Sequence, residues 1–231
     1  MSPRQPRDRF GRALARRVGW LVGAPLALFR FARREMPVEE LGTDGDGLRP
    51  LPADEPDPEH RAEDGVGPTL HRLYEAMVRE PQIDAERLIA IVAANPNVIA
   101  PIEVLRFEKA SGERGQLREG DEVLIRMAGP WNGPVTVTAR SPHCIRMAAT
   151  GGHAQLGQFE LRARDEPGRI VLEIQTRERA AGRTFRLLQR IGLIRRMQSY
   201  TWAHMLEDGA RLAGGRPPDR ITVRTWRSGG G

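Results

Sequence analysis

Apolar and polar residues repeat with two different periods along the chain after residue 68, first that of a helix and then that of a strand. Spacing of three and four residues predicts a helix between Thr69, a suitable cap, and Pro81, which would end it. The apolar positions of this predicted helix are Leu70, Leu73, Tyr74 and Met77. A second helix is expected to begin near Asp84 and to end at the Asn95-Pro96-Asn97 turn.

The period then becomes two, which is typical of strands that bury one face. Alternating segments with short turns between them follow one another, and this order predicts an antiparallel meander. The segments span residues 103–109, 121–127, 134–140, 144–149, 157–163 and 169–176.

Helical spacing returns in one long run from about residue 183 to residue 212, in which Gly192 is expected to produce a kink. A curved antiparallel sheet buries its apolar face well only if such a helix lies across its concave side. The predicted fold class is therefore α+β, with a curved antiparallel sheet gripping a long C-terminal helix. Residues 220–226 alternate once more and predict either an extra edge strand or a docking peptide.

The charge is divided unevenly along the chain, and this division separates four regions. Residues 1–35 carry nine Arg against two acids, a net of +7, whereas residues 36–80 carry twelve acids against four Arg, a net of −8. The composition of residues 36–66, rich in Pro, Gly and acids, predicts a linker. The α+β domain is expected at residues 67–215, and residues 216–231 are expected to form a strand or a tail.

The first 35 residues have the composition of a helix that lies in the plane of a membrane. Their uncharged stretch of twelve residues, from Val18 to Phe29, is shorter than the roughly 20 residues that a spanning helix needs. Arginines attract an anionic leaflet, and aromatic side chains suit the headgroup boundary. The expected membrane contacts are Arg12, Arg16, Arg17, Trp20, Leu21 and Phe29. Docking on the protein's own domain, disorder and a targeting role are the alternatives.

Two turns contain the residues with the clearest potential for ligand contact. Trp131 lies in a run of turn-forming residues, 129–134, where it either covers a ligand or packs on a neighbour. His153 follows two glycines and is either a base or ligand contact, or a partner of the backbone.

His143 and Cys144 would point to opposite faces of a strand, which argues against a nucleophile pair. The single cysteine and the spacing of the histidines indicate no metal site, and no cofactor is expected.

Three strings of the sequence resemble the bacterial and plant family known as domain of unknown function nineteen-ninety. They are GDEVLIRMAGPWNGPVTV at residues 120–137, TGGHAQLGQFEL at 150–161 and PTLHRLY at 68–74, and the resemblance covers about residues 68–213. That family is similar to the START-like (SRPBCC, Bet v 1) proteins, so the resemblance implies a helix-grip fold that holds an apolar ligand between sheet and helix. Relatives carry a Ser-Arg sequence where this chain reads Thr176-Arg177-Glu178-Arg179, so a role for that serine does not transfer.

The leading hypothesis is a non-enzymatic START-like domain that binds an apolar small molecule or lipid. The expected ligand contacts are Trp131, His153, Phe159 and Tyr200, and an inward-facing Phe159 would leave Glu160 facing water. One alternative is an enzyme of the cyclase or hydrolase type with His153 as base, and the other is a protein-interaction module without a cavity.

The expected location is the cytoplasm, in peripheral association with the inner face of the cell membrane, because positively charged flanks favour that side. An anionic membrane surface is therefore the second expected partner, through residues 1–35. The scarcity of aromatic platforms argues against nucleic acid as a partner, despite a net charge of +6.

Overall fold

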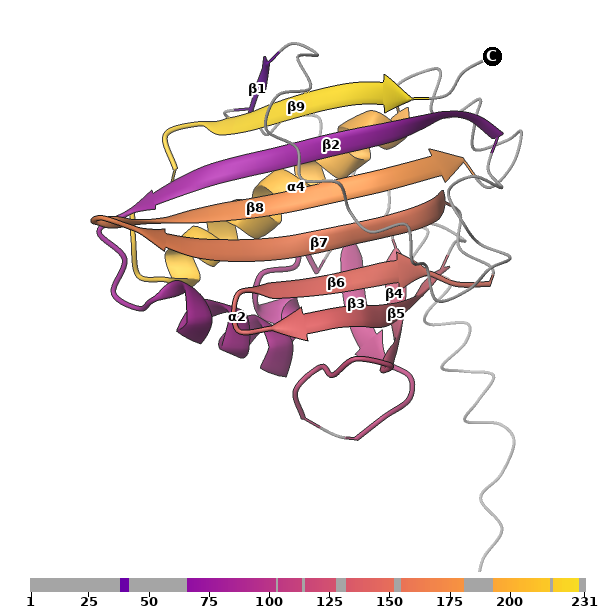
Figure 1. The fold of residues 1–231 in the computed structure, drawn as a ribbon, viewed down its shortest axis with the longest axis horizontal. Coiled ribbons are helices and arrows are strands. Elements are labelled where there is room, and N and C mark those ends of the chain that lie inside the picture. The colour runs from indigo at the N-terminus through magenta and orange to yellow at the C-terminus, as the bar shows by residue number, and fades with distance from the viewer. Residues whose placement is uncertain are drawn as a thin grey trace, which may run out of the picture.

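A nine-stranded sheet and one long helix account for most of the described residues of this computed structural model (Figure 1). The described residues are 38–41, 66–102, 104–113, 115–127, 132–151, 155–180, 193–216 and 218–228. Within them the strands are β1 Val38–Leu41, β2 Val66–Arg79, β3 Leu105–Lys109, β4 Glu122–Met127, β5 Asn132–Ser141, β6 Cys144–Ala149, β7 Gln155–Glu166, β8 Arg169–Ala180 and β9 Ile221–Ser228. The helices are α2 Ala85–Ala94, the 3-10 helix η3 Pro96–Val98 and α4 Leu193–Leu212.

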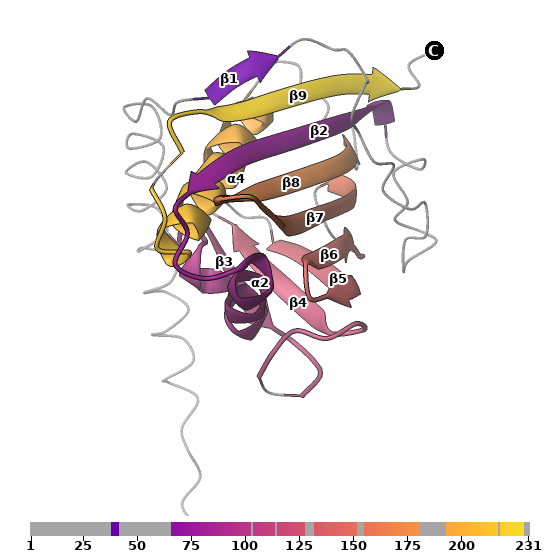
Figure 2. The same cartoon turned by 60° about the vertical axis from the view of Figure 1, so that its left-hand side comes forward.

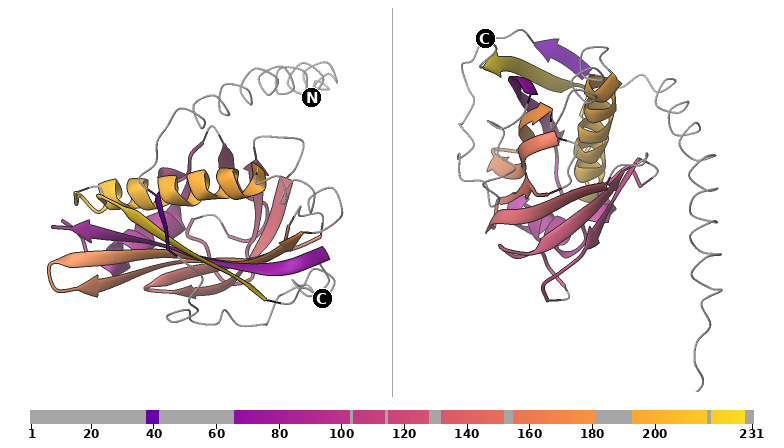
Figure 3. Two further views of the ribbon diagram at one scale, coloured as in Figure 1. Left: turned by 90° about the horizontal axis from the view of Figure 1, so that it is seen from above. Right: turned by 90° about the vertical axis from the view of Figure 1, so that its right-hand side faces the viewer.

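The strand order across the sheet is β1-β9-β2-β8-β7-β6-β5-β4-β3, so β1 and β9 lie at one edge (Figure 2). Strands β3 to β8 are neighbours in the order of the sequence and pair antiparallel, which confirms the predicted meander. Figure 3 shows α4 lying across one side of the sheet, with β3 to β5 bent towards that side. The predicted fold class, α+β with a curved sheet gripping a C-terminal helix, is confirmed.

The face of the sheet that packs on α4, called here the inner face, supplies the core. Tyr74 on β2 pairs with Ile174 on β8, and Ile174 pairs with Leu161 on β7. These side chains are buried in one cluster with Leu206 of α4. The alternation of apolar residues along the strands therefore places the core between sheet and helix.

The first predicted helix, from Thr69 to Pro81, is wrong, because residues 66–79 form strand β2. Alternate residues of β2 face α4, and Arg72 takes one of these positions, where an apolar residue would be expected. Leu73 points to the opposite face but is also buried. Because Arg72 is polar on the inner face and Leu73 is apolar on the outer face, the apolar residues of this strand are spaced like those of a helix.

The second predicted helix is confirmed as α2, and two carboxylates fix its start. Asp84 caps the helix and accepts a hydrogen bond from Arg87 N at 2.7 Å. Asp165 on β7 accepts a hydrogen bond from Ala85 N at 3.1 Å. The backbone N–H groups that a helix leaves unpaired at its start are thus used to attach α2 to the sheet.

Part of the predicted acidic linker is a strand. Residues 38–41 form β1, which pairs with β9 in parallel, and Arg220 Nη1 lies 2.5 Å from Glu39 Oε2 beside this pairing. The alternation at residues 220–226 therefore marks a strand, but β9 lies between β1 and β2 and is not the edge. Four residues that include two glutamates show no alternation of their own, so their composition concealed the strand.

Some predictions concern residues outside the described ranges. The expected membrane contacts all belong to residues 1–35, and the predicted kink at Gly192 also lies outside. The described helix α4 confirms the C-terminal part of the predicted long helix. No helix in the described ranges combines the length and the hydropathy required to cross a membrane.

Candidate functional site

Polar side chains gather between the inner face of the sheet and the first turns of α4. We call the group of Arg72, Tyr74, Thr176, Glu178 and Gln198 the inner polar cluster. Arg72 and Thr176 are register partners on β2 and β8, and each is only 2% exposed. Glu178, two residues further along β8, is 7% exposed. Buried polar groups in a core position have an energetic cost, which makes this cluster the first candidate for a site.

Gln198 of α4 joins the cation and the carboxylate of the cluster. Arg72 Nη1 donates hydrogen bonds to Gln198 Oε1 at 3.1 Å and to Tyr74 Oη at 3.2 Å. Gln198 Nε2 donates to Glu178 Oε2 at 2.5 Å. A guanidinium only donates, so the amide oxygen of Gln198 must face Arg72 and its NH₂ group must face Glu178.

Three atoms of the cluster have no hydrogen-bond partner within the described part of the chain: Arg72 Nε, Thr176 Oγ1 and Glu178 Oε1. A fourth such atom is Nε1 of Trp202, one helical turn after Gln198. Each buried polar atom without a partner costs about 1–3 kcal/mol, and more where the group is charged. Atoms of this kind, gathered at one place, are what a ligand with polar groups would satisfy.

Burial also changes the protonation chemistry of the cluster. Burial raises the pKa of Glu178, and the charge of Arg72 and the hydrogen bond from Gln198 only partly offset this effect. Burial raises the pKa of Tyr74 as well, against the opposing influence of Arg72 and of a hydrogen bond with Ser199. The cluster therefore contains a carboxyl group that binds a proton more readily than an exposed one.

An apolar surface adjoins the cluster on the neighbouring strand. Phe159 on β7 is the register partner of Thr176, and its ring centroid lies 5.1 Å from that of Trp202 on α4. Both aromatic side chains are only partly buried, although both lie between the sheet and the helix. Part of the apolar surface of these two residues is therefore open to solvent, and they neighbour Thr176 in the sheet and Gln198 in the helix.

Of the four predicted ligand contacts, Phe159 and Tyr200 belong to the described residues, and of these two Phe159 adjoins this cluster. Phe159 faces α4, as expected. Tyr200 is buried but lies outside the main apolar cluster and stacks on His204, with ring centroids 5.8 Å apart. Trp131 and His153 lie outside the described residues.

The residues at the centre of the cluster were not among the predicted site residues, although β8 contains a signal for two of them. The inward positions of β8 are apolar at Leu172 and Ile174 and then polar at Thr176 and Glu178. Polar residues that continue an apolar alternation lie on the buried face, where they need partners. Arg72 gave no comparable signal, because its strand was interpreted as a helix.

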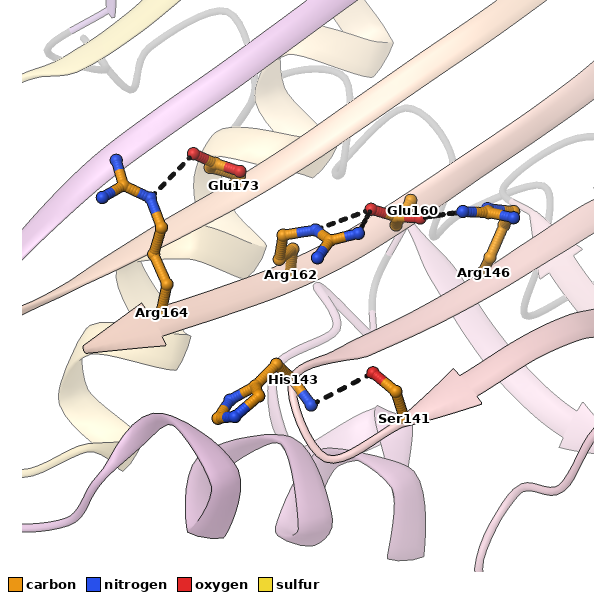
Figure 4. A network of polar contacts seen from close by, with 7 residues as sticks. All are labelled: Ser141, His143, Arg146, Glu160, Arg162, Arg164 and Glu173. Atoms are coloured by element: carbon orange, nitrogen blue, oxygen red, sulfur yellow. Dashed lines mark hydrogen bonds and ion pairs between the residues drawn. The ribbon is translucent and has the colours of Figure 1, made fainter. Parts of the chain in front are cut away.

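The outer face of the sheet carries a second polar network, which Figure 4 shows. Glu160 accepts from Arg146 Nη2 at 2.6 Å and from Arg162 Nη2 at 2.7 Å. Glu160 was expected to face water; it does lie on the outer face, but the two arginines cover it and it is only 4% exposed. Arg164 Nε is 3.3 Å from Glu173 Oε1 in the same network. Because both carboxylate oxygens of Glu160 are paired, this network needs no ligand for its stability.

His143 and Cys144 lie in different environments, but the expected reason, alternation along one strand, is wrong, because only Cys144 belongs to a strand. His143 is exposed in the turn before β6, where its N–H donates to Ser141 Oγ at 3.3 Å (Figure 4). Cys144 is buried. Over the described ranges, no three His, Cys, Asp or Glu side chains are grouped so that they would hold a metal ion.

The fold and the inner polar cluster define a helix-grip domain with a polar centre beside an apolar wall. No model of a protein family matches the sequence, and no curated protein matches it. The resemblance to the domain of unknown function nineteen-ninety therefore stays a prediction.

Solved structures with a similar arrangement include the di-domain ARO/CYC StfQ from the steffimycin biosynthetic pathway, at 13% identity and a TM-score of 0.48, over 66% of this chain and 52% of that one. Protein Ms6760 from Mycobacterium smegmatis matches at 17% identity and a TM-score of 0.40, over 62% and 91% of the two chains. Ara h 8.0201 matches at 12% identity and a TM-score of 0.35, over 57% and 97%. At these identities and scores the comparisons assign no function to the chain.

Proposed function

We propose that this chain is a START-like binding domain that holds an apolar small molecule or lipid between the inner face of the sheet and α4, without catalysis. One observation carries the proposal: three unpartnered polar atoms of the inner polar cluster lie beside the partly exposed pair Phe159 and Trp202. A molecule with an apolar body and a polar group would cover the aromatic surface and satisfy the polar atoms at once.

The magnitudes favour such a ligand. A hydrogen bond to a charged partner contributes about 1.5–3 kcal/mol and one to a neutral partner about 0.5–1.5 kcal/mol. Covering apolar surface adds roughly 25 cal/mol per Å², and aromatic side chains supply large areas. Both terms are favourable for one molecule that combines a polar group with an apolar body, and they oppose the cost of immobilising it.

Native mass spectrometry of the gently purified full chain, followed by extraction under denaturing conditions, tests the proposal. We expect a stoichiometric apolar molecule to travel with the protein. Thr176→Val removes one hydroxyl from the site and is expected to raise the dissociation constant about fivefold, the value of one neutral hydrogen bond, and so to lower the amount of molecule retained. Thr138→Val is the matched control, because Thr138 Oγ1 on β5 is also buried without a partner but is three strands away from β8.

A bare chain that also takes up no added amphiphile would contradict the proposal. Equal loss of the bound molecule in Thr176→Val and Thr138→Val would contradict the position of the site. Far-ultraviolet circular dichroism of both variants checks that the sheet is retained.

We also propose that residues 1–35 hold this domain at an anionic membrane surface, on the inner face of the cell membrane. The net charge of +7 and the apolar stretch at Val18 to Phe29 support this proposal. Deletion of residues 1–35 should transfer the protein from the membrane fraction to the soluble fraction without lowering its melting temperature. Partitioning that does not change on deletion would show that another part of the chain binds the membrane.

A further inference from the structure

The hydrogen bonds of the inner polar cluster determine where a proton is held when a ligand binds. Gln198 Nε2 donates to Glu178 Oε2, so a proton on the Glu178 carboxyl must lie on Oε1, the oxygen without a partner. In that state the three unpartnered atoms of the cluster, Arg72 Nε, Thr176 Oγ1 and Glu178 Oε1, are all hydrogen-bond donors.

We propose that the ligand of this site carries a carboxylate, which accepts hydrogen bonds from Arg72 Nε, Thr176 Oγ1 and a proton on Glu178 Oε1, so that binding takes up one proton from solution. This inference rests on the proposed function and specifies its ligand class. The proton adds to one oxygen of Glu178, and no other bond forms or breaks.

The arrangement of the three donors fits one small oxyanion. Arg72 and Thr176 are register partners on adjacent strands, which places their Cβ atoms about 5 Å apart on the same face. Thr176 and Glu178 are two residues apart on β8, about 7 Å along the same face. The aromatic pair Phe159 and Trp202 then lies on the side of Thr176 away from Arg72, where the apolar body of the ligand would extend.

The charge of the site favours the same assignment. Without ligand, Arg72 balances an ionised Glu178; with a bound carboxylate, Arg72 balances the ligand and Glu178 is neutral. Both states avoid a net charge in the interior, which would be costly. An ionised Glu178 beside a second carboxylate would instead add an uncompensated negative charge.

Charged and titratable groups come close to Glu178 from several elements of the described chain, and on β9 the register partner of Leu70 is Arg227, while Leu70 itself pairs with Glu178. In the described part of the chain, β2 presents Arg72 and Tyr74, and α4 presents the neutral Gln198. The neighbouring strand β7 presents Gly157, the register partner of Glu178, and Phe159. Because burial raises the pKa of Glu178 while the ligand carboxylate stays ionised, the proton that is taken up belongs to Glu178.

Isothermal titration calorimetry of the full chain, stripped of any bound molecule, tests this proposal with dodecanoate and its neutral analogue dodecanol. Measurements between pH 6 and pH 9 in two buffers of different ionisation enthalpy count the protons that are taken up. We expect dodecanoate to bind with uptake of up to one proton and its affinity to fall by about tenfold per pH unit above the pKa of Glu178. Dodecanol is expected to bind more weakly and without proton uptake.

Two variants assign the effect to residues. Glu178→Gln keeps a donor in place of the protonated carboxyl, so it should bind dodecanoate without proton uptake and without the pH dependence. Arg72→Met should weaken dodecanoate at least tenfold more than it weakens dodecanol, and Thr138→Val should change neither.

The outcomes separate the two proposals. If dodecanol binds as tightly as dodecanoate and no proton is taken up by the unmodified chain, the carboxylate assignment is overturned while the proposed function stands. If neither probe binds and no molecule co-purifies, both are overturned. Because proton uptake is measured on the unmodified chain, a variant that does not fold leaves this test intact.

Discussion

Replacing Lys109 by methionine is expected to destabilise the protein strongly, because this lysine binds three groups of one turn at the end of β3. Lys109 Nζ lies 2.5 Å from Asp121 Oδ2 and 2.5 Å from the carbonyl oxygen of Glu113, and 3.3 Å from that of Gln116. It is the only lysine of the chain among 36 basic residues. An ammonium group with three donors in different directions suits two carbonyls and a carboxylate better than a planar guanidinium does.

The burial of the pair sets the magnitude. The side chains of Lys109 and Asp121 are 20% and 7% exposed. Removing one partner of a fully buried ion pair costs about 3–5 kcal/mol, and the partial exposure of Lys109 reduces this to roughly 2–3 kcal/mol. The melting temperature should therefore fall by about 4–12 °C for a protein of this size.

Urea unfolding followed by circular dichroism measures the free energy of unfolding for Lys109→Met. Arg126→Met is the matched control, since Arg126 Nε bonds Glu108 Oε2 at 2.9 Å in an exposed pair between β3 and β4. Such exposed pairs contribute at most about 1 kcal/mol. The double variant Lys109→Met with Asp121→Asn should recover part of the loss, because it removes the unpaired charge. Equal losses in Lys109→Met and Arg126→Met would refute the reasoning.

Two further predictions concern the same turn. Gly112→Ala should cost at least as much as the lysine variant in a urea titration, because Gly112 has φ +90° and a Cβ there would meet Asp121 Oδ1 at 1.8 Å; an unchanged midpoint would mean that the turn repacks freely. Burial by itself would raise the pKa of Asp121, but the hydrogen bonds and charges of Lys109 and Arg118 outweigh it and lower the pKa. The stability from Asp121 is therefore present above its unfolded pKa of about 3.9 and is lost as the pH falls through its folded value. Between pH 5 and pH 2 the free energy of unfolding of Lys109→Met should accordingly fall less than that of the unmodified chain. If the two free energies fall in parallel, the Lys109–Asp121 pair does not cause this pH dependence.

The sequence predicted the meander from β3 to β8 well, because there each strand keeps apolar residues on one face and polar residues on the other. The prediction failed at β2, where Arg72 faces inward and Leu73 faces outward. The residue that breaks the alternation is the one at the centre of the inner polar cluster. A strand is recognised by its alternation of apolar and polar residues. A polar residue such as Arg72 at an inward position interrupts that alternation, so the strand is missed.

The candidate site was predictable only in part for a related reason. Phe159 follows the apolar alternation of β7 and was selected, and Thr176 and Glu178 extend the inward phase of β8. Gln198 and Trp202 belong to the candidate site because they lie on the side of α4 that faces the sheet. Helical periodicity alone does not show which neighbour a given side of a helix meets.

The parallel pairing of β1 with β9 fixes the length of the tether between the N-terminal segment and the domain. Only residues 36 and 37 separate residues 1–35 from β1, so the step from residue 35 to residue 38 spans at most about 10 Å. The acidic residues 42–65 run between β1 and β2, two strands that have only β9 between them. They therefore set no distance between the N-terminal segment and the sheet. Residues inserted before β1 would let the domain move away from a surface held by residues 1–35, whereas residues inserted between β1 and β2 would only lengthen the chain that connects these two strands.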